Sequence, residues 1–121
     1  MMKQYTDKQI QDTLKIVDSS IAGCEKVKLK LKEGSPQLSL NTNRLKALYL
    51  SKAFLEEKKQ NYTSDEIERA VIQITSIKDK STTGIKNAKE GTGTYTRFCR
   101  IIQAMDIVLD YLQCGYSSVL E

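Results

Sequence analysis

Apolar residues recur at helical spacing in four stretches of the chain. In the first stretch they are separated by three or four positions, which places them on one face of a helix: Ile10, Leu14, Val17, Ile21 and Cys24. The whole pattern predicts helices at about 6–33, 36–59, 63–89 and 94–113. The fourth stretch is the most apolar, so its helix is expected to be the most buried.

Two of the predicted helix starts carry the same capping signal. Thr6 and Thr63 can each accept a hydrogen bond from a free amide of the first turn. Gln9 and Glu66, three residues later, can reach back to the amide of the capping residue. Two independent rules therefore place a helix start at both sites.

Short joints are predicted between the helices of each pair. Gly34 and Gly91 suit the left-handed conformation that ends a helix, because glycine has no Cβ to clash there. Ser35 then caps the next helix, in front of a proline that suits the first helical position. In the second joint Thr92 or Thr94 takes the cap. Such short joints make consecutive helices antiparallel.

The chain aligns with itself. A shift of 57 residues superimposes residues 5–55 on residues 62–112 without a gap, and the matches fall where helices start, stop and are buried. We therefore predict an all-α protein, an antiparallel four-helix up-down-up-down bundle made of two duplicated helical hairpins. It forms one domain over residues 1–121, with residues 114–121 as a loose tail. Both glycine joints are expected at the same end of this bundle.

Composition and charge exclude few functions. The chain has 121 residues, of which 40% are hydrophobic and 28% charged, and a formal charge of +4. This excess is small and dispersed for a nucleic-acid-binding protein. No apolar run resembles a signal peptide or is long enough to span a membrane, so we expect a cytoplasmic protein.

The residues needed for common catalytic and metal sites are missing from the sequence. There is no histidine, and the three cysteines, Cys24, Cys99 and Cys114, are too widely spaced for a zinc motif. A catalytic cysteine would lack the base that normally activates it. We therefore predict no enzyme activity, no metal site and no cofactor.

The glycine-rich joints are the one candidate site. Backbone amides at a glycine-rich turn that opens a helix can hold an anion or a nucleotide phosphate. Basic and polar residues near the two joints complete this candidate set: Lys32, Gly34, Ser35, Arg44, Lys89, Gly91, Thr92, Gly93, Thr94, Arg97 and Arg100. The P-loop pattern is absent, and a plain structural joint explains the glycines as well.

Lysines at positions 26, 28, 30 and 32 are a second basic feature. Spacing by two spreads them over more than one helix face, so they form no single basic stripe. A solvated helix end explains them better than a nucleic-acid site, because no aromatic residues are interleaved for base stacking.

The duplicated hairpin with its Glu33-Gly34-Ser35 and Glu90-Gly91-Thr92 joints resembles small uncharacterised cytoplasmic helical proteins of Gram-positive bacteria. In size, basic charge and helical content the chain is also similar to bacteriocin immunity proteins, although no motif residue matches that family. The function favoured by the sequence is a non-enzymatic module that binds a protein partner or itself. The alternatives are the anion site, an immunity-type role and weak nucleic-acid binding.

Overall fold

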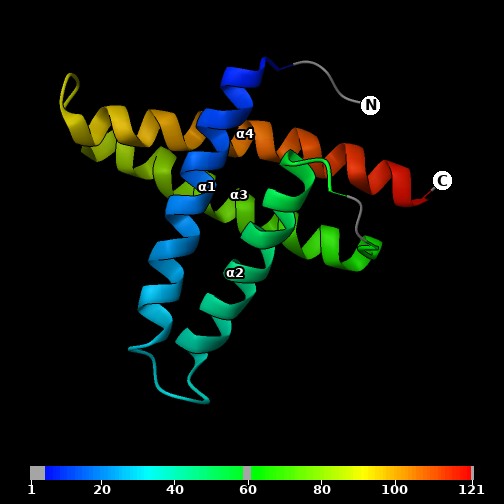
Figure 1. The fold of residues 1–121 in the computed structure, drawn as a ribbon. Helices are drawn as coiled ribbons and strands as arrows, with labels where there is room; N and C mark the ends of the chain where they lie inside the picture. Colours follow the sequence, from blue (N-terminus) through cyan, green and yellow to red (C-terminus); the bar gives the residue numbers. More distant parts are fainter. Residues whose placement is uncertain (1–4, 59–60, 121) are drawn as a thin grey trace.

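The computed structural model describes residues 5–58 and 61–120, and these residues form four α-helices and no strand. The helices are α1 (Asp7–Lys28), α2 (Pro36–Leu55), α3 (Ser64–Asn87) and α4 (Gly93–Leu120). Helices α1 and α2 form one antiparallel hairpin, and α3 and α4 form another (Figure 1). The predicted all-helical class is confirmed.

Local capping determines the helix starts, as predicted. The Thr6 hydroxyl accepts the Gln9 amide at 3.1 Å, and the Gln9 side chain accepts the Thr6 amide at 2.8 Å. Thr63 and Glu66 repeat this capping box at 3.1 and 3.0 Å. Ser35 caps α2 through its hydroxyl oxygen, with the proline at the first helical position.

Three helices end earlier than the apolar pattern predicted. Helix α1 ends at Lys28 instead of residue 33, because Val27 and Leu29, 47% and 88% exposed, find no helix to cover them. Helix α2 ends at Leu55, where Glu57 takes a left-handed conformation with φ of 56°. The amides that follow bond back to carbonyls of the last turn, in the pattern of a Schellman motif. Helix α3 ends two residues early, at Asn87.

Helix α4 continues to Leu120, through a segment that the sequence analysis treated as a tail. Gly115 lies close to the ring of Phe54 in α2, and the Tyr116 hydroxyl donates to a Glu68 carboxylate oxygen at 2.7 Å. These contacts with α2 and α3 explain why the helix extends beyond residue 113. Residue 121 lies outside the described residues.

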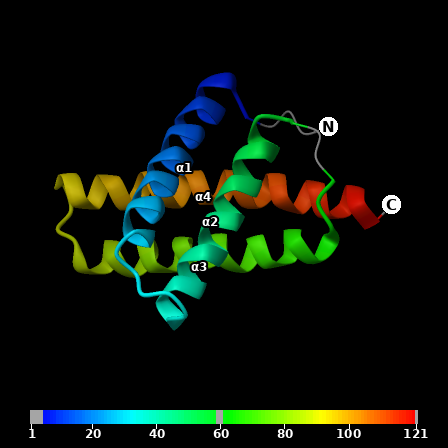
Figure 2. The ribbon, with the colours of Figure 1, turned by 60° about the horizontal axis from the view of Figure 1, so that its bottom comes forward.

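The two hairpins cross each other instead of lying side by side. The α1–α2 hairpin runs steeply across the α3–α4 hairpin in both views (Figures 1 and 2). Helix α2 packs against all three other helices and α4 likewise, whereas the backbones of α1 and α3 do not approach each other within the described residues. The expectation of one antiparallel up-down-up-down bundle does not describe this crossed arrangement.

Small buried side chains lie where helices of different hairpins meet. Ala47 and Ala70 are buried between α2 and α3, and Thr13 and Ala104 are buried between α1 and α4. The Thr13 hydroxyl donates to the Gln9 carbonyl at 2.7 Å, so it is buried without an unmade hydrogen bond. Such side chains let crossing helices approach closely, which favours the crossed packing.

The core is built from matching positions of the two hairpins. Under the 57-residue shift, buried residues of one hairpin correspond to buried residues of the other: Val17 with Ile74, Leu48 with Met105, and Leu55 with Leu112. Helix α2 has buried residues on several sides and shares the centre of the core with α4. Deep burial is therefore not confined to α4, which the sequence predicted to be the most buried helix.

Candidate functional site

The two glycine joints have the same local structure. Gly34 and Gly91 have φ values of 79° and 87°, a conformation that glycine tolerates best. The Ser35 amide donates to the Lys32 carbonyl at 3.1 Å, and the Thr92 amide donates to the Lys89 carbonyl at 3.2 Å. The predicted left-handed glycines are confirmed, but each lies in a separate turn that follows the helix end, since α1 and α3 have already ended.

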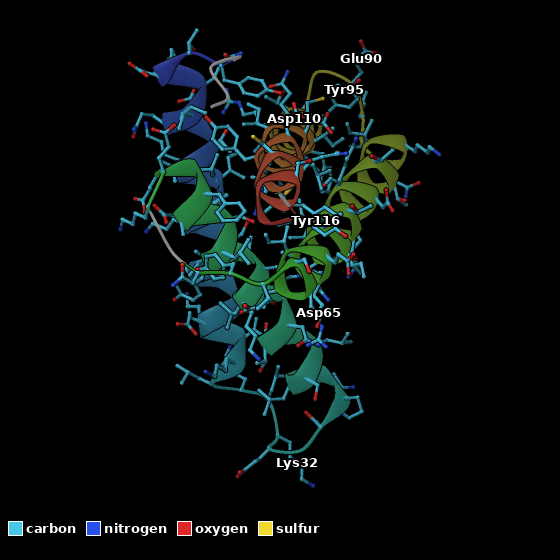
Figure 3. All side chains as sticks on the ribbon, turned by 90° about the vertical axis from the view of Figure 1, so that its right-hand side faces the viewer. Lys32, Asp65, Glu90, Tyr95, Asp110 and Tyr116 are labelled. Atoms are coloured by element: carbon cyan, nitrogen blue, oxygen red, sulfur yellow. The ribbon has the colours of Figure 1, made fainter. Side chains whose placement is uncertain are left out.

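The joints do not come together into one site. Figure 3 shows Lys32, in the first joint, and Glu90, in the second, at opposite ends of the molecule. The expectation that both joints lie at one end is therefore wrong, because the crossing of the hairpins carries their loops apart. Gly34 and Ser35 stay with the first joint, and Gly91, Gly93 and Thr94 stay with the second.

Two further candidates for the anion site, Thr92 and Arg44, form hydrogen bonds within the protein. The Thr92 hydroxyl donates to the Lys89 carbonyl at 2.6 Å and accepts the Tyr95 amide at 3.3 Å, so Thr92, not Thr94, caps α4. Arg44 donates to the Ser76 hydroxyl at 3.2 Å, across the contact between α2 and α3.

The two arginines of α4 complete that set. Arg97 is exposed, and Arg100 lines a groove between α1 and α4. The candidate residues thus spread over two joints and two helix contacts, and they form no common anion site.

Two grooves lie between helices of different hairpins. The α2–α3 groove, of about 750 Å³, is lined by Asn43, Lys46, Ala47, Tyr49, Leu50, Tyr62, Glu66, Arg69, Ala70, Ile72 and Gln73, with further residues from α1 and α2. The α1–α4 groove, of about 710 Å³, is lined by Tyr5, Lys8, Gln9, Asp12, Thr13, Lys15, Ile16, Arg100, Gln103, Ala104, Asp106 and Ile107. Both volumes are in the range of ordinary ligand-binding pockets.

The grooves are counterparts under the same 57-residue shift. Every residue that lines the α1–α4 groove, apart from Lys8, corresponds to a residue that lines the α2–α3 groove. The aromatic contacts correspond as well. Tyr5 stacks on Tyr111 with ring centroids 6.5 Å apart, and Tyr62 meets Phe54 edge-on at 5.7 Å. Each hairpin thus places the tyrosine before its first helix against the last turns of the other hairpin.

The exposed side chains of the two grooves differ in kind. The α2–α3 groove presents Tyr49 and Ile72, which are 47% and 66% exposed. The corresponding positions in the α1–α4 groove are Asp106 and Lys15. Ile72 and Tyr49 thus leave apolar surface in contact with water within one groove, and an apolar patch in a groove is one of the features that mark interaction sites.

The carboxylates of the α2–α3 groove are already engaged within the protein. Glu25 accepts a hydrogen bond from the Tyr49 hydroxyl at 3.0 Å, which raises the pKa of that tyrosine. Glu66 accepts the amide and the hydroxyl of Thr63 in the capping box.

The cations of this groove are less constrained. Lys28 and Lys46 form no ion pair within the described residues. Arg69 pairs with Asp65 at 3.1 Å, but both side chains are largely exposed, so this pair contributes little stability. The lining of this groove thus carries three cations and two carboxylates, a net formal charge of +1.

Some of the charges that line the α1–α4 groove form ion pairs. Asp12 pairs with Lys8 at 3.0 Å, and the hydrogen bond from Lys8 lowers the Asp12 pKa. Asp106 pairs with Lys78 of α3, which raises the Lys78 pKa. Lys15 and Arg100 form no ion pair within the described residues, so the polar lining of the α1–α4 groove, with three cations and two carboxylates, keeps a net formal charge of +1.

Sequence analysis did not identify Tyr49 or Ile72 as functional residues. The self-alignment contains the signal, since it pairs an apolar residue with a charged one at both positions. Each of these positions is helical in both hairpins, but it is apolar in one and charged in the other. Folding therefore does not require a particular polarity there, and the side chain can serve another role.

Metal-ligating residues and thiols are other groups of the described residues that could carry chemistry. Among them no cluster of His, Cys, Asp or Glu is placed to hold a metal ion. Cys24 and Cys99 are half-buried, Cys114 is exposed, and burial raises the Cys24 pKa, which makes its thiol less reactive. Of the helices described, none combines the length and apolar character that crossing a membrane requires. Comparisons with protein families, with curated proteins and with solved structures found no match, so the function is inferred from the residues themselves.

Proposed function

We propose that this chain is a non-enzymatic protein-interaction module of the cytoplasm and that the α2–α3 groove is its docking surface. The observation that carries this proposal is the exposed pair Tyr49 and Ile72, which lies in a groove whose counterpart carries Asp106 and Lys15 instead. Burial of an exposed isoleucine under a partner releases about 1.5–3 kcal/mol when it is complete. Free thiols at three cysteines fit a reducing compartment.

Duplication of an ancestral hairpin accounts for the existence of two grooves. The ancestor would have paired with a second copy of itself, forming two identical grooves at a twofold interface. After fusion into one chain, each groove was free to change separately. Matching caps, matching buried residues and matching groove linings support this history.

The proposal is tested by photo-crosslinking in cells that produce the chain naturally. A photoreactive phenylalanine analogue is placed at Ile72 in one variant and at the corresponding Lys15 in a control variant. We expect a discrete adduct from position 72, and we expect Tyr49→Asp to suppress it. Adducts of equal yield from both positions, or none from position 72, would contradict the proposal.

A further inference from the structure

We propose that the segment that docks in the α2–α3 groove is an acidic amphipathic helix of a partner protein. This inference rests on the proposed function and adds the chemistry of the partner. It follows from three features of the groove: its apolar centre, the sign of its available charge and the shape made by two crossing helices.

The apolar centre is suited to one or two anchoring side chains. Ile72 and Tyr49 are its exposed part, and Ala47, Leu50 and Ala70 form a buried floor behind them. Apolar side chains of a partner that enter here would cover Ile72. Energy at such contacts is usually concentrated in a few anchors of this kind.

The lining around this centre carries a small net positive charge. Lys28, Lys46 and Arg69 outnumber Glu25 and Glu66, whose oxygens accept hydrogen bonds from Tyr49 and Thr63 and keep their negative charge. A partner that places carboxylates beside its apolar anchors would meet these cations. The chain as a whole carries +4, so it attracts an acidic partner more than a second copy of itself.

The walls of the groove favour a helix as its occupant. Two crossing helices leave a notch into which a ridge of a third helix can pack. A helix offers apolar anchors at positions i and i+3 or i+4 on one face, which would meet the exposed apolar residues of the groove, Tyr49 and Ile72. Glutamates on the flanking positions of that helix would reach the groove cations.

The test uses three fluorescent helical peptides that share leucine anchors and differ only in their flanking residues, which are glutamate, glutamine or lysine. Binding to the full chain is measured by anisotropy at two salt concentrations. We expect the glutamate peptide to bind at least about tenfold more tightly than the lysine peptide, with the difference shrinking at high salt.

Matched variants locate the effect. Lys46→Glu should weaken binding of the glutamate peptide about tenfold, whereas Gln103→Glu, at the corresponding position of the α1–α4 groove, should leave it within about twofold. Ile72→Lys should abolish binding of every peptide.

The outcomes separate the two proposals. If all three peptides bind equally and Ile72→Lys abolishes binding, the acidic preference is wrong but the docking surface stands. If the chain forms a dimer that Ile72→Lys dissociates, the occupant is a second copy and the inference is overturned. If no peptide binds and position 72 yields no crosslink in cells, both proposals fail.

Discussion

The α2–α3 and α1–α4 grooves are made from corresponding residues of two similar hairpins, yet they present different surfaces. Their buried parts agree: Ala47 and Leu50 correspond to Ala104 and Ile107. Their exposed parts diverge, with Tyr49 and Ile72 in one groove and charged residues in the other. Folding constrains buried positions through packing, whereas it leaves exposed positions open to another purpose. The α1–α4 groove thus acts as an internal control for the α2–α3 groove.

The largest effects should come from the shared core. Leu48 and Met105 are corresponding residues, and both are completely buried. We expect Leu48→Ala and Met105→Ala each to lower the free energy of unfolding by about 2–5 kcal/mol, through lost burial and a residual cavity. Urea unfolding of both variants measures this. A cost below about 1 kcal/mol for either would show that the two hairpins do not share one core.

A second difference between the hairpins concerns how closely their helices pack. A Cβ at Gly84 in α3 would lie 2.6 Å from ring atoms of Phe98 in α4. We expect Gly84→Ala to destabilise the protein by about 1 kcal/mol, because overpacking outweighs the gain in helix propensity. Gly23 in α1 has open space around it and is the control, since Gly23→Ala should stabilise by about 0.5–1 kcal/mol. Thermal unfolding distinguishes the two signs, and a stabilising Gly84→Ala would contradict the close packing.

The tyrosines that link the hairpins provide a smaller test. The Tyr5 hydroxyl donates to an Asp110 carboxylate oxygen, whereas Tyr62 packs against Phe54 and its hydroxyl forms no hydrogen bond to the described residues. We expect Tyr5→Phe to cost about 1 kcal/mol and Tyr62→Phe to stay within about 0.5 kcal/mol. Equal costs would mean that the hydrogen bond contributes nothing beyond the ring contact.

The same hydrogen bond predicts a pH dependence. It raises the pKa of Tyr5 from 10.0 to about 12, with burial and the nearby acidic charges adding to the shift. Above pH 10 the unfolded chain loses this proton while the folded chain keeps it, so this contribution to stability falls until the pH passes about 12. The stability difference between wild type and Tyr5→Phe should therefore shrink over this range in urea titrations. A difference that stays constant would contradict the assignment.

The smallest effect on stability is expected at the residue with the largest role in binding. Ile72 is exposed, so Ile72→Lys should change the free energy of unfolding by no more than about 0.5 kcal/mol. Circular dichroism during thermal unfolding checks this. A substantial loss of stability would mean that Ile72 supports the fold, and its effect on binding could then not be assigned to docking.

Local features of the fold could be predicted from the sequence, and its assembly could not. The caps at Thr6, Ser35 and Thr63 depend on residues within one turn, so a single sequence specifies them. Helical periodicity identifies a buried face but not the helix that covers it. The crossing of the hairpins therefore could not be predicted, although Ala47 and Ala70 are the kind of small residues that permit it.

A single anion site built from both glycine joints required them at one end, and the crossing of the hairpins separates them. The α2–α3 groove was missed because its key residue, Ile72, belongs to no buried stripe. Its exposure becomes evident only when the positions of α2 and α3 are known.

Backbone NMR mapping of the glutamate peptide on the full chain tests the central claim most directly. We predict that amide shifts on titration concentrate in residues 43–50 and 66–73, which line the α2–α3 groove, and that residues 8–16 and 100–107 of the α1–α4 groove stay unchanged. Shifts of similar size in both grooves, or in neither, would contradict the claim that only one of two matching grooves has become a docking surface.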